Sequence, residues 1–319
     1  MTISVALCTY NGDKHLREQL DSILSQQLPV DEIIVCDDRS TDQTWCILKN
    51  YQQENPDIFQ IFQNEKSLGS NKNFEKCIQK CTKTLLFLSD QDDVWQVDKT
   101  QKISVIFKEN LKIKAVCTNG FLIDDRSQRL EEYFPKWDVI GEFLIKNPAT
   151  DLFNFITTKG NIATGATMAI KTDFYRMAIP FPMLKNFHHD EWIALLASAE
   201  NALFFLNEKL TKYRIHNQQQ VGGIAFHVNS GLFESILNYF NLNAQNNDFK
   251  SLKSRLRSQI EWHNKFLIHF KTNPKYAILN TRFLREMNKT QKMMEKKYPI
   301  RSFLLKTMDR LNNKRQLLP

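Results

Sequence analysis

The first ninety residues alternate between two hydrophobic patterns. Short runs that are apolar throughout predict buried strands, and each is joined to the next by a stretch whose apolar residues recur every three or four positions, which predicts a helix. The predicted strands are residues 3–10, 32–37, 58–62 and 84–89. Short apolar strands joined through helices are typical of a mostly parallel sheet that is covered on both faces. The sequence therefore predicts an α/β fold.

Polar side chains gather where these predicted strands end. Open α/β sheets bind ligands in the crevice at the carboxyl ends of their strands, so we expect these side chains to meet at one edge. They are Thr9, Tyr10 and Asn11 on the first strand, Asp37 and Asp38 on the second, and Asp90, Asp92 and Asp93 on the fourth.

The three aspartates within residues 90–93 need an explanation, because burying unpaired carboxylates costs several kcal/mol per ion. They are either solvated or paired on an exposed loop, or they hold a divalent cation. Asp90 and Asp92 are two positions apart, so an extended backbone turns both to the same side. Magnesium and manganese prefer carboxylate oxygens and keep positions open for water and phosphate. This alternative predicts a metal site for a phosphorylated ligand.

Two common phosphate-binding motifs, GxxxxGK[ST] and GxGxxG after the first strand, are absent from the sequence. Their absence argues against a P-loop NTPase and a dinucleotide dehydrogenase. The pair Asp37 and Asp38 offers an acceptor for the N–H of a uracil or thymine ring, or else a cap for the next helix. Because neighbouring strand residues point in opposite directions, we expect only one of them to reach a ligand.

Residues 140–217 follow a less regular pattern, which should close the crevice. It predicts a strand at 162–170, a helix at 190–199 and two short strands at 202–206 and 209–215. Beyond about residue 220 the pattern turns helical and basic, so we expect a boundary there.

Four segments strongly resemble the family 2 glycosyltransferases with the GT-A fold, and SDQDDVW resembles most a bacterial branch often labelled rhamnosyltransferase-like. The resemblance covers about residues 1–220. The segments, in chain order, are SVALCTYNG, DEIIVCDDRSTDQT, SLGSNKNFEKC and LLFLSDQDDVWQVDK.

This resemblance implies a GT-A catalytic domain at 1–220, with a nucleotide-sugar half at about 1–120 and an acceptor half at about 121–220. It implies an inverting enzyme that moves a sugar from dTDP-rhamnose or a UDP-sugar to a glycan or lipid-linked acceptor in bacterial surface polysaccharide synthesis. It also implies Mg²⁺ or Mn²⁺ as cofactor. A single displacement of this kind needs one general base and no covalent nucleophile.

The resemblance also implies roles on the donor side. Asp92 would be the main metal ligand, joined by Asp90 in the Asp-x-Asp element, with Asp93 supporting ribose or metal, and Asp38 would hold the base. The other implied donor contacts are Thr9, Tyr10, Asn11, Gly69 and Asn73, with Asn71 as a weaker candidate.

In the second half, FHHDEW and YRIH carry the resemblance. Asp190 would be the general base, with Glu191 in reserve, although Asp190 can equally cap the following helix. His216 would complete the metal or diphosphate site, and Arg214 would pair with phosphate. The implied acceptor-side residues are Gly165, where the backbone could approach closely, His189 and Trp192.

The C-terminal region, residues 221–319, is predicted to be mainly helical and basic. Residues 250–319 carry 18 Lys and Arg against 4 Asp and Glu, whereas residues 1–249 carry 25 against 31. Basic amphipathic helices can lie on an anionic membrane surface. Alternatively, the helices pack on the catalytic domain or form a homodimer contact. Nucleic-acid-binding signatures are absent, so we expect no nucleic-acid partner.

We also expect a cytoplasmic protein, with peripheral contact at the inner face of the plasma membrane as one possibility, because a signal peptide and a long apolar run are missing from the sequence. Two rival functions remain open. A sugar nucleotidyltransferase would need a Gly-rich, Arg- and Lys-bearing loop after the first strand, which is absent. A non-catalytic nucleotide-sugar-binding or scaffold protein would not need Asp90, Asp92 and Asp190.

Overall fold

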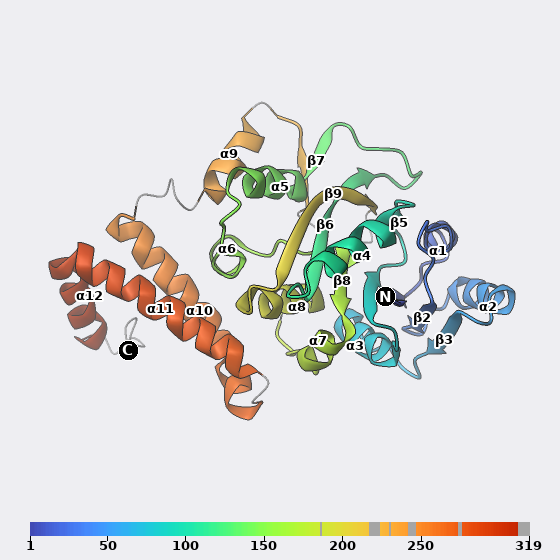
Figure 1. The fold of residues 1–319 in the computed structure, drawn as a ribbon, viewed down its shortest axis with the longest axis horizontal. Coiled ribbons are helices and arrows are strands. Elements are labelled where there is room, and N and C mark those ends of the chain that lie inside the picture. Colours follow the sequence, from blue (N-terminus) through green and yellow to red (C-terminus); the bar gives the residue numbers. More distant parts are fainter. Residues whose placement is uncertain (186, 217–223, 230, 242–246, 274–275, 312–319) are drawn as a thin grey trace.

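A mostly parallel eight-stranded sheet forms the centre of the molecule (Figure 1). The structure is a computed structural model, and it describes residues 1–185, 187–216, 224–229, 231–241, 247–273 and 276–311. The strand order is β3-β2-β1-β4-β8-β6-β9-β5. The strands are β1 (Ile3–Thr9), β2 (Glu32–Asp37), β3 (Phe59–Gln63), β4 (Leu85–Ser89), β5 (Val94–Trp95), β6 (Ala115–Ile123), β8 (Met168–Lys171) and β9 (Leu203–Arg214).

The four strands predicted from the first ninety residues are confirmed as β1 to β4. β1 pairs in parallel with both β2 and β4, and β2 pairs in parallel with β3. In this register Thr9 lies beside Asp37, and Leu7 lies beside Ser89. The carboxyl ends of β1, β2 and β4 therefore meet at one edge of the sheet, as the sequence predicts.

Successive residues of the central strands face two separate hydrophobic cores. On β1, Val5 and Leu7 enter one core, and Ala6 and Cys8 enter the other. This explains why the strands are apolar throughout, since both faces are covered. The core that contains Val5 and Leu7 is covered by helices α1 (Leu16–Leu24), α2 (Thr44–Glu54) and α4 (Lys99–Glu109). The core that contains Ala6 and Cys8 is covered by helices α3 (Ser70–Lys80), α5 (Lys136–Lys146), α6 (Leu152–Lys159), α7 (Thr172–Ala178) and α8 (His189–Ala199).

The second half of the sheet differs from the sequence prediction in two places. The predicted strand at 162–170 is limited to β8, which starts at Met168, because residues Gly165–Thr167 form a 3-10 turn. The two short strands predicted at 202–206 and 209–215 are one strand, β9, whose register with β6 shifts near Asn119. The helix predicted at 190–199 is confirmed as α8. A small sheet of β7 (Tyr133–Pro135) and β10 (Ala225–His227) lies outside the main sheet.

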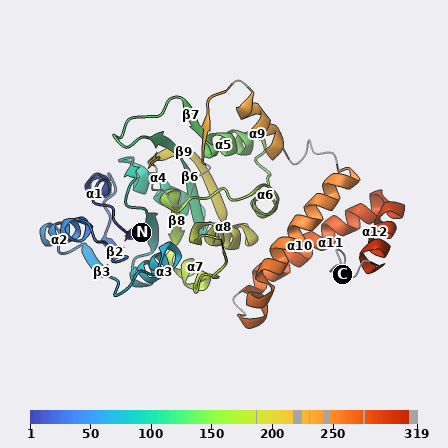
Figure 2. The ribbon, with the colours of Figure 1, turned by 180° about the vertical axis from the view of Figure 1, so that it is seen from behind.

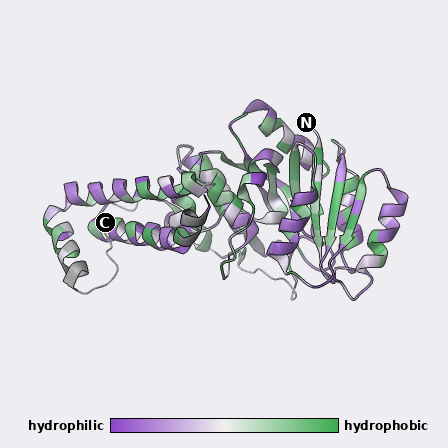
Figure 3. Cartoon of the chain, turned by 90° about the horizontal axis from the view of Figure 1, so that it is seen from below, coloured by the Kyte–Doolittle hydropathy of each residue, from purple (hydrophilic) through white to green (hydrophobic). Residues whose placement is uncertain are grey.

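The predicted C-terminal helical extension is present as four helices among the described residues (Figures 1 and 2). The long helices of this region alternate hydrophilic and hydrophobic surfaces, as Figure 3 shows. They are α9 (Leu232–Phe240), α10 (Phe249–Thr272), α11 (Ala277–Lys297) and α12 (Pro299–Leu311).

Helices α10 and α11 pack against the part of the chain that precedes residue 220. Phe266 of α10 packs against Trp192 of α8, with ring centroids 5.2 Å apart. The Tyr276 hydroxyl donates to the carbonyl of Pro180 at 2.7 Å, and Arg282 of α11 forms an ion pair with Asp151. A boundary near residue 220 stays a prediction, but these contacts tie both sides of it together. No helix in the described part of the chain is long and apolar enough to cross a membrane.

We predict that Phe266→Ala lowers the free energy of unfolding by about 3–5 kcal/mol, because it empties a fully buried ring site. Leu267→Ala, at the neighbouring exposed position, is the matched control and should change the free energy by less than about 1 kcal/mol. Urea unfolding followed by tryptophan fluorescence measures both. Equal effects of the two substitutions would mean that the C-terminal helices are not part of the core.

Candidate active site

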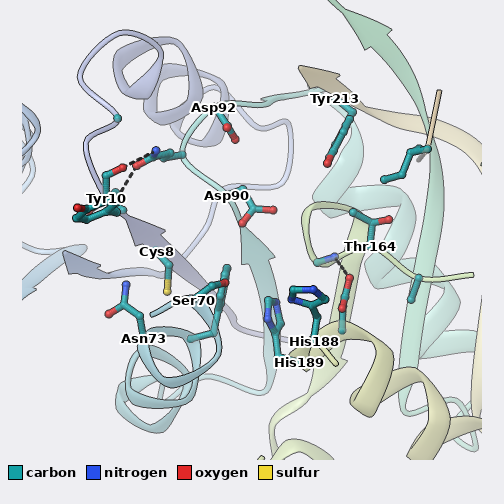
Figure 4. A pocket seen from close by; sticks show the side chains of 18 of the residues that line it. Cys8, Tyr10, Ser70, Asn73, Asp90, Asp92, Thr164, His188, His189 and Tyr213 are labelled. Atoms are coloured by element: carbon teal, nitrogen blue, oxygen red, sulfur yellow. Dashed lines mark hydrogen bonds between the residues drawn. The ribbon is translucent and has the colours of Figure 1, made fainter. Parts of the chain in front are cut away.

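A cleft of about 1020 Å³ opens at the carboxyl ends of β1, β2 and β4 (Figure 4). It brings together most of the side chains that the sequence singles out, although they come from distant parts of the chain. Those that line it are Thr9, Tyr10, Asn11, Asp38, Gly69, Asn73, Asp90, Asp92, Gly165, His189, Asp190, Glu191 and His216. Asp93, Trp192 and Arg214 do not.

Asp38 is held by the loop that follows β3. Its Oδ1 accepts hydrogen bonds from the amide of Asn64 and the N–H of Leu68, both at 2.7 Å. Its Oδ2 accepts from the hydroxyl of Ser67 at 2.8 Å and the N–H of Gly69 at 2.9 Å. Burial alone would raise the pKa of Asp38, but these hydrogen bonds hold it below its usual value. A nucleotide base that contacts Asp38 would have to compete for this carboxylate with the loop groups that already donate hydrogen bonds to it.

Asp37, the other member of the pair, faces away from the cleft and is fully buried. It accepts hydrogen bonds from the hydroxyls of Thr9, at 2.8 Å, and Ser40. The expectation that only one of the two aspartates reaches the cleft is met.

Gln91, between the two Asp-x-Asp carboxylates, fastens this loop to the end of β1. Its Oε1 accepts from the N–H of Tyr10 at 2.8 Å, and its Nε2 donates to the carbonyl of Tyr10 at 3.0 Å (Figure 4). The amide also lies over Gly12, where an added Cβ would be 2.2 Å from Oε1. Only glycine fits beneath this side chain. Sequence reasoning missed Gln91, because nothing in its spacing distinguishes it from a solvated loop residue.

Asp90 and Asp92 share the cleft with Asp190, as the sequence predicts. Burial, together with the charges of Asp92 and Asp190, raises the pKa of Asp90 to about 7, and the Lys99 ammonium opposes this rise. Asp92 Oδ2 lies 2.8 Å from Nε2 of His216. Asp92 and His216 are therefore neighbours in the cleft, and the predicted role of His216 at a metal or diphosphate stays a prediction.

Arg214 does not fit the predicted contact with phosphate, because its side chain is fully buried outside the cleft. Its guanidinium donates to the carbonyl of Asp92 at 2.7 Å, the carbonyl of Asp124 at 2.8 Å and the carboxylate of Glu18 at 2.6 Å. Arg214 thus fixes the acidic loop from behind. The sequence could not show this, because Glu18 lies 196 positions away.

Asp93 also lies behind the cleft, with 1% of its surface exposed, so it does not fit the predicted support of ribose or a metal. Its Oδ1 accepts from the N–H of Arg214 at 3.0 Å, and its Oδ2 is buried with no hydrogen-bond partner among the described residues. Burial and the charges of Asp92 and Asp90 raise the pKa of Asp93 well above its usual range. Trp192 is likewise a core residue, and its indole N–H donates to the carbonyl of Ala178 at 2.8 Å.

Two backbone N–H groups orient the carboxylate of Asp190, which lies at the start of α8. Its Oδ2 accepts from the N–H of Gly165 at 3.1 Å, and its Oδ1 accepts from the N–H of Glu191 at 2.7 Å. Beside it, burial raises the pKa of Glu191 to about 7, although Lys265 and Lys136 oppose the rise. The pair therefore offers one carboxylate with fixed geometry and a second whose pKa burial raises above its usual value.

His189 packs closely beside this group. Its ring stacks on Phe74 at 4.0 Å between centroids, and both ring nitrogens are buried without a hydrogen-bond partner in the described protein. Burial lowers the pKa of His189 to about 4, so the imidazole is neutral. An added Cβ on Gly165 would be 2.9 Å from Nε2 of His189. Gly165 therefore lies in tight contact with His189, and its predicted role beside an acceptor stays a prediction.

Asn71, predicted as a weaker donor contact, instead clamps the segment before α8. Its Nδ2 donates to the carbonyl of Phe187 at 2.8 Å, and its Oδ1 accepts from the N–H of His189 at 2.9 Å.

At the mouth of the cleft, Lys14 and His15 contact Asp125 at 2.6 and 3.2 Å. The sequence analysis did not anticipate Lys14 or His15 in the cleft, because they follow β1 without a distinguishing motif.

The described residues contain no group of three His, Cys, Asp or Glu side chains that could hold a metal ion by itself. A magnesium site does not require such a group, because the ion is usually held by one or two carboxylates together with phosphate oxygens. The carboxylates of Asp90 and Asp92 repel each other within one cleft, and a cation bound beside them would offset this repulsion. Divalent cations such as Mg²⁺ and Mn²⁺ prefer carboxylate oxygens as ligands. The residues fit a cation that arrives with a phosphorylated ligand.

A mostly parallel sheet with convergent acidic residues around one cleft is the GT-A arrangement that the sequence predicts. Residues 4–177 match the family model described as Glycosyl transferase family 2. Because this match spans more than half of the chain, the chain belongs to glycosyl transferase family 2, and the resemblance seen in the sequence is confirmed.

The chain is also similar to curated relatives. It is 26% identical, over 68% of its length and 65% of the relative, to an uncharacterized glycosyltransferase from Nostoc sp.. It is 37% identical, over 29% of its length and 34% of the relative, to the dTDP-rhamnosyl transferase RfbG from Shigella flexneri. The chain spans less than two thirds of the length of both relatives.

Two solved structures share the fold. One is S. aureus TarS 1-349 in complex with UDP-GlcNAc, with a TM-score of 0.54, 16% identity and coverage of 92% of this chain and 83% of that one. The other is the mannosyltransferase PcManGT from Pyrobaculum calidifontis in complex with GDP-Man and Mn²⁺, with a TM-score of 0.51, 15% identity and coverage of 92% and 84%. At these identities the likeness concerns the fold alone.

Proposed function

We propose that this protein transfers a sugar from a nucleotide-diphosphate sugar to a hydroxyl group of a glycan or lipid-linked acceptor, with inversion at the anomeric carbon. The observation that carries the proposal is the meeting of Asp38, Asp90, Asp92 and Asp190 in one cleft at the strand ends. Family membership supports the reaction class. The similarity to a dTDP-rhamnosyl transferase favours dTDP-rhamnose as donor, with UDP-sugars as the alternative.

In this proposal the donor lies along the β1, β2 and β4 ends of the cleft. Tyr10, Asn11, Gly69 and Asn73 line the nucleotide side, and Thr9 and Asp38 fix the backbone beneath it. The diphosphate lies next to Asp90, Asp92 and His216. We propose Mg²⁺ or Mn²⁺ there, which when bound would offset the negative charge that grows on the leaving diphosphate.

Asp190 takes the proton of the acceptor hydroxyl in this mechanism. A general base must lie within ~2.6–3.2 Å of that hydroxyl and hold a fixed direction. The N–H groups of Gly165 and Glu191 give the Asp190 carboxylate this direction, while the cleft continues past it along Glu191 and His188. Glu191, whose pKa burial raises to about 7, stays the reserve base. Inversion follows because the hydroxyl attacks on the face opposite to the diphosphate.

The two rival functions predict different products. A sugar nucleotidyltransferase would make a nucleotide sugar from a nucleoside triphosphate and a sugar phosphate. A non-catalytic binding or scaffold protein would bind nucleotide sugars without consuming them. The oriented Asp190 carboxylate, in the same cleft as Asp90 and Asp92, favours transfer over both. A donor-consumption assay with acceptor separates transfer from both rivals, and an assay that supplies a nucleoside triphosphate and a sugar phosphate identifies a nucleotidyltransferase.

We predict that Asp190→Asn lowers kcat for sugar transfer by about 10²–10⁴-fold, because the amide cannot accept the proton. Donor binding should persist, measured as the rise in melting temperature that the nucleotide sugar produces. Asp173→Asn, on the exposed start of α7, is the control and should transfer normally. Near-normal turnover by Asp190→Asn would remove Asp190 from the role of base.

We predict that excess EDTA abolishes transfer and that added Mn²⁺ or Mg²⁺ restores it. The physical reason is the repulsion between Asp90 and Asp92, which a bound cation would offset beside the diphosphate. A coupled assay for the released nucleotide diphosphate measures the effect. Unchanged transfer in EDTA would rule out the proposed cofactor.

We also propose that the C-terminal region contacts an anionic membrane surface from the cytoplasmic side. Three apolar side chains on one face of α12 are exposed: Ile300 by 76%, Phe303 by 68% and Leu304 by 53%. They lie within the strongly basic part of the chain, which complements anionic lipid. A lipid-linked acceptor would be reached from this position.

We predict that the full chain floats with vesicles that contain phosphatidylglycerol, and that the combined substitution of Ile300, Phe303 and Leu304 by Ser weakens binding at least ~10-fold. Ile278→Ser, at an exposed apolar site on α11, is the control. Binding that is unchanged by the triple substitution contradicts the proposal. If the triple substitution instead converts a dimer into a monomer, the surface is a homodimer contact.

A further inference from the structure

Tyr213 is a buried side chain whose hydroxyl opens into the cleft. It lies on β9, and 8% of its surface is exposed. Its ring packs edge-on against Trp137, with the ring centroids 5.5 Å apart and the planes at 86°. The hydroxyl has no hydrogen-bond partner among the described residues. A buried tyrosine hydroxyl usually has one, so this oxygen is suited to a partner that enters the cleft.

The backbone beside Tyr213 is fixed to the acidic loop. The N–H of Arg214 donates to Oδ1 of Asp93 at 3.0 Å, and the guanidinium of Arg214 donates to the carbonyl of Asp92 at 2.7 Å. Neighbouring strand residues point in opposite directions, so Arg214 is buried outside the cleft while Tyr213 lines it. The Tyr213 ring therefore enters the cleft at a fixed place relative to the acidic loop.

The hydroxyl faces the space between the two parts of the proposed reaction. Figure 4 shows it turned into the cleft, with Asp90 on one wall and Thr164 on another. Asp90 belongs to the proposed diphosphate side, and the turn after Thr164 begins at Gly165, whose N–H orients Asp190. In a single displacement the sugar lies between the leaving diphosphate and the attacking hydroxyl. The group that enters the space in front of Tyr213 is therefore the transferred sugar.

The chemistry of a phenol suits a sugar at this place. The ionised carboxylates of Asp90, Asp92 and Asp190 only accept hydrogen bonds, whereas the hydroxyl of Tyr213 can both donate and accept. A sugar ring presents neutral hydroxyls of the same kind. A sugar that lacks the matching hydroxyl would leave the phenol unpaired inside the closed site, which disfavours it.

We propose that Tyr213 is a specificity-determining residue, whose hydroxyl forms a hydrogen bond with one ring hydroxyl of the transferred sugar. The inference rests on the proposed function, because it names a contact to the substrate of that same site. It concerns the sugar and not the nucleotide or the diphosphate, and this distinction makes it testable without an acceptor.

Tyr213→Phe removes the hydroxyl and keeps the ring. The probes are dTDP-rhamnose with dTDP, and UDP-glucose with UDP, titrated calorimetrically in the presence of Mg²⁺. The Kd of the nucleotide sugar should rise by about 10-fold, the size expected for one neutral hydrogen bond, while the Kd of the matching nucleoside diphosphate stays within twofold. Equal losses would mean that the hydroxyl contacts the diphosphate, and no loss would mean that it contacts neither; both outcomes overturn the inference. A wild-type protein that binds neither nucleotide sugar also overturns it.

Tyr51→Phe is the matched control. Tyr51 is likewise 8% exposed, but it lies outside the cleft and its hydroxyl donates to Asp21 at 2.6 Å. This variant should melt about 2–4 °C lower and bind both ligands as the wild type does. Tyr213→Phe should melt within about 1 °C of the wild type, because its hydroxyl has no partner in the protein to lose. A larger fall for Tyr213→Phe would show that the hydroxyl is structural, against the inference.

Donors that lack a single ring hydroxyl identify the contact. The wild type and Tyr213→Phe are compared with the complete donor and with its 2-, 3- and 4-deoxy forms. The kcat/KM of the two proteins should differ by about 10-fold for the complete donor and by less than twofold for one deoxy form, in which the contact is already lost. A constant ratio over all four donors contradicts the proposed contact.

The two proposals fail in distinguishable ways. If the wild-type protein binds nucleotide sugars but transfers sugar to no acceptor tested, the proposed function fails, and the contact of Tyr213 is still decided by the two dissociation constants. If transfer occurs and Tyr213→Phe binds and reacts as the wild type does, only the contact fails.

Discussion

The accumulation of like charge at one edge of the sheet is the constraint on which the rest of this structure depends. Asp90, Asp92, Asp93 and Asp190 meet where β4 ends and α8 begins, and carboxylates this close cannot all remain ionised in a partly buried place without compensation. The protein supplies this compensation from the side of the acidic loop that faces away from the cleft. The guanidinium of Arg214 holds the backbone of the acidic loop, and the Lys99 ammonium opposes the rise in the pKa of Asp90. The front faces the cleft, where we propose that a cation and its phosphorylated ligand bind.

The period of two along the strands divides the acidic residues into supporting and exposed groups. Asp37 turns into the protein and receives the hydroxyls of Thr9 and Ser40, while Asp38 turns to the cleft. In the loop after β4 the same division recurs, since Asp92 faces the cleft and Asp93 is buried. One residue of each adjacent pair therefore supports the wall of the cleft from inside the protein, and the other turns its carboxylate toward the cleft.

Sequence reasoning predicted the fold and the edge of the sheet at which the site lies, because both follow from local periodicity and from the order of strands and helices. It failed where a side chain's role depends on a distant partner. Arg214 follows a strand and looks able to bind phosphate, but Glu18 and Asp124 take its guanidinium. Trp192 stands two positions after Asp190, yet α8 turns it into the core. The strand predicted at 162–170 is shortened by the 3-10 turn that begins at Gly165, where His189 packs closely against the backbone.

Asp190 is placed by parts of the chain that no local pattern connects. Asn71 of α3 clamps the backbone on both sides of His188, and the Gly165 turn fixes the carboxylate. On the other side, Phe266 of α10 packs against both Phe187 and Trp192, which flank the same segment. The direction of this carboxylate therefore depends on helix α3, on the turn at Gly165 and on the C-terminal helices together. A change in how α10 packs would reach Asp190 through two aromatic contacts, so the C-terminal region is a structural part of the site and not an appendage to it.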